Sequence, residues 1–114
     1  MKIIIAGSRT FNDYNLLKSS CDNLLTQFTN IEIVSGTARG ADKLGERYAR
    51  EKGYSIKEFP ANWNLGKSAG YIRNAEMAQY SDMLIAFWDG TSKGTKHMID
   101  LANKIGIKVE IVNY

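Results

Sequence analysis

Short apolar runs alternate along the chain with longer amphipathic stretches, and glycine-bearing turns separate the two. Five of the short runs have strand length and are rich in Ile, Val or Phe: residues 2–6, 31–35, 55–59, 83–87 and 107–112. Between these runs the apolar positions recur at helical spacing. A regular alternation of strand and helix is typical of α/β proteins whose strands run parallel.

The clearest helical pattern lies between the first two strands. Its apolar side chains recur every three or four residues, and they are Leu17, Cys21, Leu24, Leu25 and Phe28. We expect this helix to begin near a capping residue, Asn12 or Asp13. Cys21 belongs to the apolar face, so we expect a buried thiol and not a nucleophile.

Three more helices are predicted, at residues 41–52, 71–80 and 95–104. Gly53 and Gly106 follow the first and the last of these, as glycine commonly follows the end of a helix. The apolar face of the last helix holds Met98, Leu101, Ala102 and Ile105.

The composition of the strands predicts their order in the sheet. Residues 2–6 and 83–87 are continuous apolar runs and 31–35 nearly so, which is typical of strands covered by helices on both faces. Residues 55–59 and 107–112 alternate apolar with charged side chains, so we place them at the edges. Right-handed crossovers then give a five-stranded parallel sheet of order 3-2-1-4-5 in a Rossmann-like three-layer α/β fold. The alternative flavodoxin-like order, 2-1-3-4-5, would put the second strand at an edge of the sheet. Its mostly apolar run IEIV fits an edge position less well.

Length, charge and composition exclude several classes of protein. The 114 residues suit a single domain, because domains cluster at about 100–150 residues. A net charge of +3 without a basic run does not favour nucleic acid as a partner. One cysteine and one histidine form neither a disulfide nor a Cys/His zinc site, so we expect no metal. We also expect no cofactor. No apolar run reaches the roughly 20 residues of a bilayer span, and no leader pattern opens the chain, so we expect a cytoplasmic protein without a membrane partner.

Three loops follow the strands at the centre of this predicted sheet, where the chain reverses direction. Residues 7–11, 36–42 and 88–95 each combine glycine with Ser or Thr and with one Arg or Lys. Glycine lets backbone N–H groups approach an oxyanion, hydroxyls add donors, and the following helix presents its positive N-terminus. Glycine-rich turns are also ordinary connections in α/β proteins, but three of them at one point predict a phosphorylated ligand.

Five segments resemble a known family: GSRTF, SGTARGAD, FPANW, GKSAGYIRNAEMA and AFWDGTSKGTKHMI. In this order they are similar to the small single-domain SLOG proteins of the YspA and YpsA-related branch, over nearly the whole chain. The resemblance implies a Rossmann-like fold that binds nucleotides or nucleotide-derived ligands. The superfamily also contains DprA and the LOG phosphoribohydrolases, and its small members are often encoded by phages.

Most of the candidate ligand-binding residues are carried over from this resemblance by position. They are Gly7, Ser8 and Arg9, then Ser35, Gly36, Arg39, Gly40 and Asp42, then Arg73 and Asn74, and finally Asp89, Gly90, Ser92, Gly94 and Thr95. The first loop adds Thr10 and Phe11. We expect Asp42 and Asp89 to accept ribose hydroxyls.

Two positions depart from the family pattern. The second loop commonly has two glycines, and here Thr37 takes the second place and narrows the room beside a ligand. In LOG enzymes the Gly-Thr of the phosphate loop is followed by two further residues and then by a glutamate that is central to their activity, and here that position is Met98. Met98 also fits the apolar face of its helix. Glu76 is the only nearby acid that could substitute, which makes it a weak catalytic candidate.

Residues 61–68 match a relaxed P-loop pattern, but two bulky residues stand where the backbone would wrap an anion, and Gly70 follows closely. We interpret this segment as a flap over the site, with Trp63, Lys67 or Arg73 touching the ligand. Trp88 either stacks on a base or packs as part of the wall. His97 lies in a charged turn, and we expect it to be solvated and not catalytic.

Three functions from different classes follow. The leading hypothesis is a homo-oligomeric binding protein for a nucleotide-like small molecule, either ADP-ribose-like or a cyclic nucleotide, that acts as a sensor or as a phage-encoded sequestering protein in the host cytoplasm. The second is an N-glycosidase or phosphoribohydrolase, and the missing acid at Met98 disfavours it. The third is a single-strand nucleic-acid binder like DprA.

Overall fold

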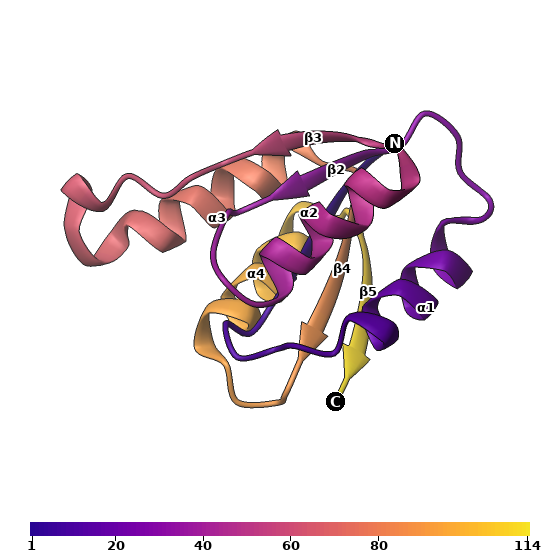
Figure 1. Cartoon of the computed structure of the whole chain (residues 1–114). Helices are drawn as coiled ribbons and strands as arrows, with labels where there is room; N and C mark the ends of the chain where they lie inside the picture. Colours follow the sequence, from indigo (N-terminus) through magenta and orange to yellow (C-terminus); the bar gives the residue numbers. More distant parts are fainter.

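The computed structural model describes residues 1–114 and consists of five strands, four α-helices and one 3-10 helix. In chain order these are β1 (Lys2–Gly7), α1 (Tyr14–Leu25), β2 (Glu32–Ser35), α2 (Ala41–Lys52), β3 (Ser55–Glu58), η1 (Trp63–Ser68), α3 (Ala69–Tyr80), β4 (Met83–Trp88), α4 (Lys93–Ile105) and β5 (Lys108–Asn113). The strands form one sheet of order β3-β2-β1-β4-β5, and every pair is parallel (Figure 1). The predicted Rossmann-like order is therefore confirmed.

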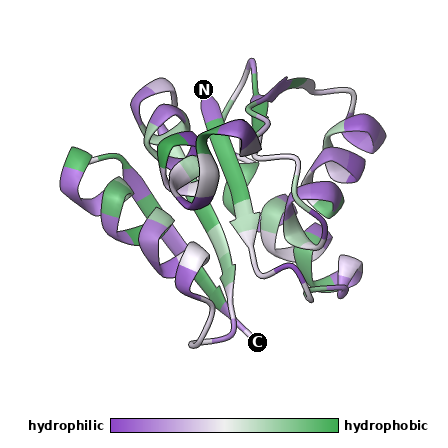
Figure 2. Ribbon diagram, turned by 90° about the vertical axis from the view of Figure 1, so that its left-hand side faces the viewer, coloured by the Kyte–Doolittle hydropathy of each residue, from purple (hydrophilic) through white to green (hydrophobic).

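The sheet is the middle of three layers because alternate side chains of its central strands point to opposite faces. Ile3 and Ile5 of β1 belong to the core under α1 and α2, whereas Ile4 and Ala6 belong to the core under α3 and α4. Figure 2 shows the hydrophobic central strands between helices whose outer surfaces are hydrophilic. β3 and β5 keep exposed or half-exposed side chains, as the alternation of charge in their sequences predicts.

The helices agree with the periodic pattern except near some of their ends. Asp13 caps α1, and its side chain accepts the N–H of Leu16. α1 ends at Leu25, so Phe28 lies in the turn that follows and packs on the core from there. The predicted start of α3 is wrong by two residues, because the chain passes directly from η1 into the helix at Ala69.

The predicted apolar face of α4 is correct only in part. Met98 and Ala102 are buried, as predicted, but Ile99 is also buried and Ile105 is 45% exposed. Ile105 is the last residue of the helix, and Gly106 with φ 94° turns the chain away there toward β5. None of the helices combines the length and apolarity that a bilayer span requires.

Cys21 is fully buried in the core under α1 and α2. Burial raises the pKa of its thiol to about 12, and the nearby Asp22 carboxylate adds to this effect. Because the thiolate is the nucleophilic form, this cysteine is unreactive at neutral pH, as its position in the apolar pattern predicts.

The loop after β1 and the loop after β2 pack directly on each other. The N–H of Ala41 donates to the carbonyl oxygen of Ser8 at 3.3 Å. Gly40 has φ 81°, and a Cβ at this position would lie only 2.4 Å from that same carbonyl oxygen. Glycine is therefore required at position 40, because it lets the loop before α2 lie against the loop after β1.

Candidate functional site

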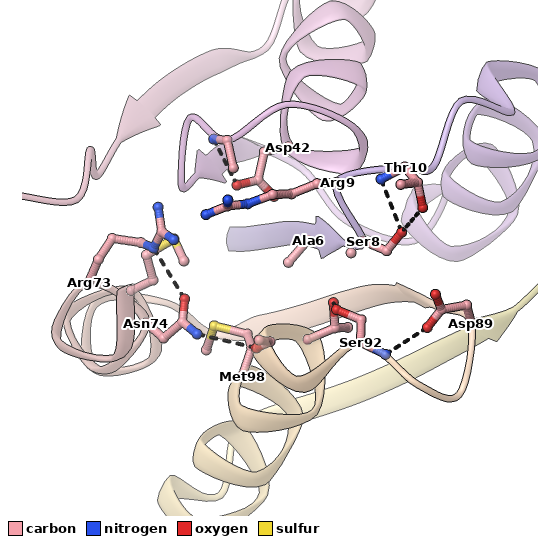
Figure 3. A pocket seen from close by; sticks show the side chains of 15 residues that line it. Ala6, Ser8, Arg9, Thr10, Asp42, Arg73, Asn74, Asp89, Ser92 and Met98 are labelled. Carbon is pink, nitrogen blue, oxygen red and sulfur yellow. Dashed lines mark hydrogen bonds between the residues drawn. The ribbon is translucent and has the colours of Figure 1, made fainter. Parts of the chain in front are cut away.

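A cavity of about 400 Å³ opens at the carboxyl ends of β1 and β4, and we call it the first cavity (Figure 3). The residues predicted from the sequence that line it are Gly7, Ser8, Arg9, Thr10, Asp42, Arg73, Asn74, Asp89, Ser92, Gly94 and Thr95. Ligands of open α/β sheets bind at this kind of topological switch point. The volume is within the range of small-molecule sites, which is about 300–1,000 Å³.

Two neighbouring cavities extend the site toward η1, and Arg9 and Arg73 line all three. The second, of about 360 Å³, is also lined by Gly36, Thr37, Ala38, Arg39, Ala61 and Trp63. The third, of about 200 Å³, is also lined by Trp63, Lys67, Gly70, Tyr71, Asn74 and Gly94. In Figure 1 the segment of η1 and the start of α3 projects at the left, beyond the sheet. The segment interpreted as a flap thus forms one wall of these two cavities.

Five of the predicted residues line none of the three cavities. Phe11 is buried and stacks on Phe87, with ring centroids 5.1 Å apart. The hydroxyl of Ser35 donates to the Glu46 carboxylate at 2.6 Å, so it stabilises β2 against α2. Gly40 and Gly90 contribute backbone only. The remaining residue is Trp88. Its indole N–H donates to the carbonyl oxygen of Ser92 at 3.1 Å, and its ring packs on the core under α3 and α4. These contacts favour the wall-packing alternative for Trp88.

Several lining residues were not predicted as part of the site. They are Ala6, Thr37, Ala38, Ala61, Gly70, Tyr71, Met77 and Met98. Met98 was identified as the position of the missing acid, and the structure places its thioether in the wall of the first cavity at 2% exposure. The other apolar residues have no chemical signal in the sequence, since a small or apolar side chain is equally typical of a core.

The cationic side chains of the site have no ionic partners in the protein. All six ion pairs of the structure lie elsewhere, and none includes Arg9, Arg39, Lys67 or Arg73. Arg73 is only 9% exposed, and burial, together with the nearby Arg9, lowers the pKa of its guanidinium. An arginine stays protonated even so. The nearby Asp42 carboxylate opposes this lowering of the pKa, but no carboxylate lies within ion-pair distance of Arg73, so its guanidinium remains available to an external anion.

Hydrogen bonds hold Arg73 and its neighbour Asn74 in place. The Nη1 of Arg73 donates to the carbonyl oxygen of Gly36, and its Nε donates to the Oδ1 of Asn74 at 3.2 Å. The Asn74 amide nitrogen in turn contacts the carbonyl oxygen of Gly94 at 3.4 Å and the Nδ1 of His97 at 3.2 Å. This chain of contacts joins the loop after β2 to the start of α4.

The expectation that His97 is solvated is wrong. The ring is half-buried, accepts from Asn74 and meets the edge of Tyr71, with ring centroids 4.4 Å apart. Burial lowers the pKa of His97, so the neutral ring that can accept at Nδ1 is the form favoured at neutral pH.

The start of α4 offers unpaired backbone donors to the first cavity. The N–H groups of Lys93, Gly94 and Thr95 have no hydrogen-bond partner, and no side chain caps the helix. The preceding loop is different, because Oδ1 of Asp89 accepts the N–H groups of Thr91 and Ser92 at 2.9 and 2.8 Å. These bonds lower the pKa of Asp89. Only the first turn of the helix, and not the whole loop, is therefore available to an anion.

Asp42 is the buried carboxyl of the first cavity, at 7% exposure. Its Oδ2 accepts the N–H of Ala38 at 3.1 Å, and its Oδ1 has no hydrogen-bond partner. A Cβ at Gly36 would lie 2.8 Å from Oδ2 of Asp42 and 3.0 Å from Nη1 of Arg73, so the glycine lets both groups close over the loop. In Figure 3 the Arg9 side chain extends beneath Asp42 toward Arg73.

The charge state of Asp42 reflects a competition between burial and its neighbours. Burial raises its pKa to about 6, although the Ala38 N–H and the guanidiniums of Arg73 and Arg9 oppose the rise. Asp42 is therefore mostly ionised at neutral pH, at a cost to the folded state.

The first loop is held by the end of the chain. The Tyr114 hydroxyl donates to Oγ of Ser8 at 2.6 Å, and Ser8 also accepts the N–H of Thr10 at 3.3 Å. The Tyr114 ring meets the edge of Phe11, with ring centroids 4.7 Å apart. These contacts orient the loop that carries Arg9.

Glu76, the weak catalytic candidate, is exposed and lines none of the cavities. It lies two residues after Asn74, and two residues turn an α-helix by about 200°, so its carboxylate is on the opposite face of α3. No three His, Cys, Asp or Glu side chains come together as a possible metal site.

Asp42→Asn tests the cost of the buried carboxylate. The pKa of Asp42 is about 6 in the folded protein against a usual 3.8, so between these values the folded state binds more protons than the unfolded chain. Its contribution to stability therefore falls as the pH rises through this range, by about 3 kcal/mol in all. The Asn oxygen can still accept from Ala38. We expect urea denaturation to give the variant about 1–3 kcal/mol more free energy of unfolding than the original protein at pH 8, and no gain at pH 4.

The matched control is Asp100→Asn, an exposed carboxylate that pairs with Lys96 on α4. It should show no gain at pH 8. If Asp42→Asn adds no stability at pH 8, the buried Asp42 carboxylate does not destabilise the folded protein.

Comparison with known proteins identifies the family of the chain. The model of the YspA, cpYpsA-related SLOG family matches residues 1–66, which include β1, β2 and the loops that follow them. The Gene 61 protein of Mycobacterium phage D29 is 35% identical over 116 residues, and the alignment covers 95% of this chain and 93% of that protein. The second half of the site, from α3 to α4, falls within this longer alignment. On both grounds the chain belongs to the YspA, cpYpsA-related SLOG family.

Proposed function

We propose that the protein binds a nucleotide-derived small molecule through the phosphate groups of the ligand. The observation that carries this proposal is the pair of guanidiniums, Arg9 and Arg73, which line all three cavities and have no ionic partner. A guanidinium can bind a phosphate through two parallel hydrogen bonds. The free N–H groups at the start of α4 supply further donors to the same space.

Membership of the SLOG family supports nucleotide-related binding or processing, and the phage relative supports a role for such a protein in an infected cell. We propose that the protein acts in the cytoplasm, as a sensor or as a sequestering protein for a nucleotide signal. Sequestration needs tight binding and no turnover, and the apolar Met98 in the wall of the first cavity is compatible with both.

Arg9→Gln tests the phosphate contact, because the Arg9 side chain is exposed and makes no hydrogen bond or ion pair that the fold would lose. We expect calorimetric titration with ADP-ribose to give micromolar or tighter binding, and at least tenfold weaker binding for the variant. A charge-assisted hydrogen bond contributes about 1.5–3 kcal/mol, which corresponds to about tenfold or more.

Lys104→Gln is the matched control, since Lys104 is an exposed cation on α4 that lines no cavity. Its affinity should equal that of the original protein. Equal affinity in the Arg9 variant would refute the proposed phosphate site.

We expect no turnover of the bound ligand. Cleavage of an N-glycosidic bond passes through an oxocarbenium-like transition state. A carboxylate is needed there, either to stabilise this state or to activate the attacking water. Met98 occupies the position of the LOG glutamate, and Glu76 points away from the cavities. Chromatography after incubation with nucleoside monophosphates or ADP-ribose should therefore detect no free base. Multiple turnovers that Asp42→Asn or Glu76→Gln abolishes would instead establish a hydrolase.

We also propose a homodimer or higher oligomer, because a domain of this size seldom encloses a ligand alone, and the cavities are open beside η1 and α3. Leu65 and Ile72 are 52% and 42% exposed in this region and line none of the cavities, so a second subunit can bury them without blocking the site. Light scattering at high micromolar concentration should give at least twice the chain mass, and Ile72→Asp should lower it to the monomer. A monomer mass for the unaltered protein contradicts this proposal.

A further inference from the structure

The three cavities differ in the chemistry of their walls. Both acidic side chains of the site, Asp42 and Asp89, line only the first cavity. The indole of Trp63 lines only the second and third, which contain no carboxylate. Arg9 and Arg73 stand where the cavities meet. The site therefore changes from hydroxyl-accepting through cationic to aromatic along its length.

Trp63 is 60% exposed, and two neighbouring residues approach its indole. The Asn62 side chain accepts the N–H of Asn64 and so caps η1 at the residue before the ring. On one side the indole approaches Gly70, where a Cβ would lie 3.9 Å from it. The Cζ of Arg9 lies 5.9 Å from the ring centroid. An exposed indole beside an arginine that has no ion-pair partner is a stacking surface for a planar ring.

The Asp42 and Asp89 carboxylates are held in the same way. Each uses one oxygen for backbone N–H groups, since Oδ2 of Asp42 accepts from Ala38 and Oδ1 of Asp89 accepts from Thr91 and Ser92. The Oδ1 of Asp42 has no hydrogen-bond partner and is free to accept, whereas the Thr91 side chain also interacts with the Asp89 carboxylate. A carboxylate repels a phosphate but accepts sugar hydroxyls, so this end of the site favours a polyhydroxyl group.

On the basis of the proposed function, we infer that the ligand is a sugar nucleotide linked through a diphosphate and bound in one direction. Its base stacks on Trp63, and its phosphates lie between Arg9, Arg73 and the start of α4 at Gly94, which lines both the first and the third cavity. The hydroxyls of its terminal sugar donate to Asp42 and Asp89. A mononucleotide occupies only part of this site. A sugar phosphate without a base occupies only the other part.

Three probes test this direction by calorimetric titration: AMP, ribose 5-phosphate and ADP-ribose. We expect ADP-ribose to bind at least tenfold more tightly than either of the others. Trp63→Ala should weaken AMP and ADP-ribose at least tenfold but ribose 5-phosphate less than twofold, and Trp63→Phe should restore most of the loss. Asp42→Asn should weaken ribose 5-phosphate more than AMP, because the Asn oxygen accepts from Ala38 and its NH₂ then faces the cavity.

Fluorescence provides a second measurement that a merely structural role of Trp63 would not change. The chain has two tryptophans, so Trp88→Phe leaves Trp63 as the only indole. Stacking should quench its emission when ADP-ribose binds, and ribose 5-phosphate should not.

The outcomes separate this inference from the proposed function. Binding that depends on Arg9 but not on Trp63 refutes the stacking position and leaves the phosphate site in place. If none of the probes binds, both fail. A change of oligomeric mass in Trp63→Ala would assign the indole to a subunit contact, and tighter binding of a single-stranded oligonucleotide than of ADP-ribose would assign the surface to nucleic acid. Either result overturns the assignment.

Discussion

Parallel pairing of β1 with β2 on one side and β4 on the other determines where every part of the site can lie. β1 and β4 are in register from Ile3 and Met83 to Gly7 and Phe87, so the two strands end together. The chain leaves them toward opposite faces of the sheet, and the loops separate there and leave a cavity. Helices cover both faces of these two strands, so residues 3–6 of β1 and 83–87 of β4 are buried. The same pairing therefore provides the rigid core and the open site.

Several features of the site reduce stability. Arg73 and Asp42 are buried charges, yet they form no ion pair with each other within 4 Å. Thr37 has φ 64°, in the left-handed region that costs a β-branched residue about 1–2 kcal/mol. This is the position where the family commonly has a second glycine. Such concentrations of strain and unpaired charge are typical of sites prepared for a ligand.

Met98 shows how one position can belong to the core and to the site. Its side chain joins the cluster under α3 and α4, with Met77 and Ala102, and also forms part of the wall of the first cavity. A glutamate in this environment would have to be desolvated against apolar neighbours. The thioether removes that cost and with it the acid that hydrolysis of a glycosidic bond uses. In this chain Met98 therefore contributes to the packing of the core, and no carboxylate stands at this position.

The strand order and the end of the sheet where the cavities lie follow from local properties of the sequence, namely apolar runs, charge alternation and glycine-bearing loops. The sequence also indicates Arg9, Asp42, Arg73 and Gly94, most of them through the family resemblance. Which loop side chains face the cavity depends on packing between distant parts of the chain. Phe11 and Trp88 were candidates and turned out to pack inward, whereas Ala38 and Tyr71 line the site without any signal in the sequence. The reason is that the direction of a side chain depends on partners far along the chain, such as Tyr114 for the first loop and Gly36 for Arg73.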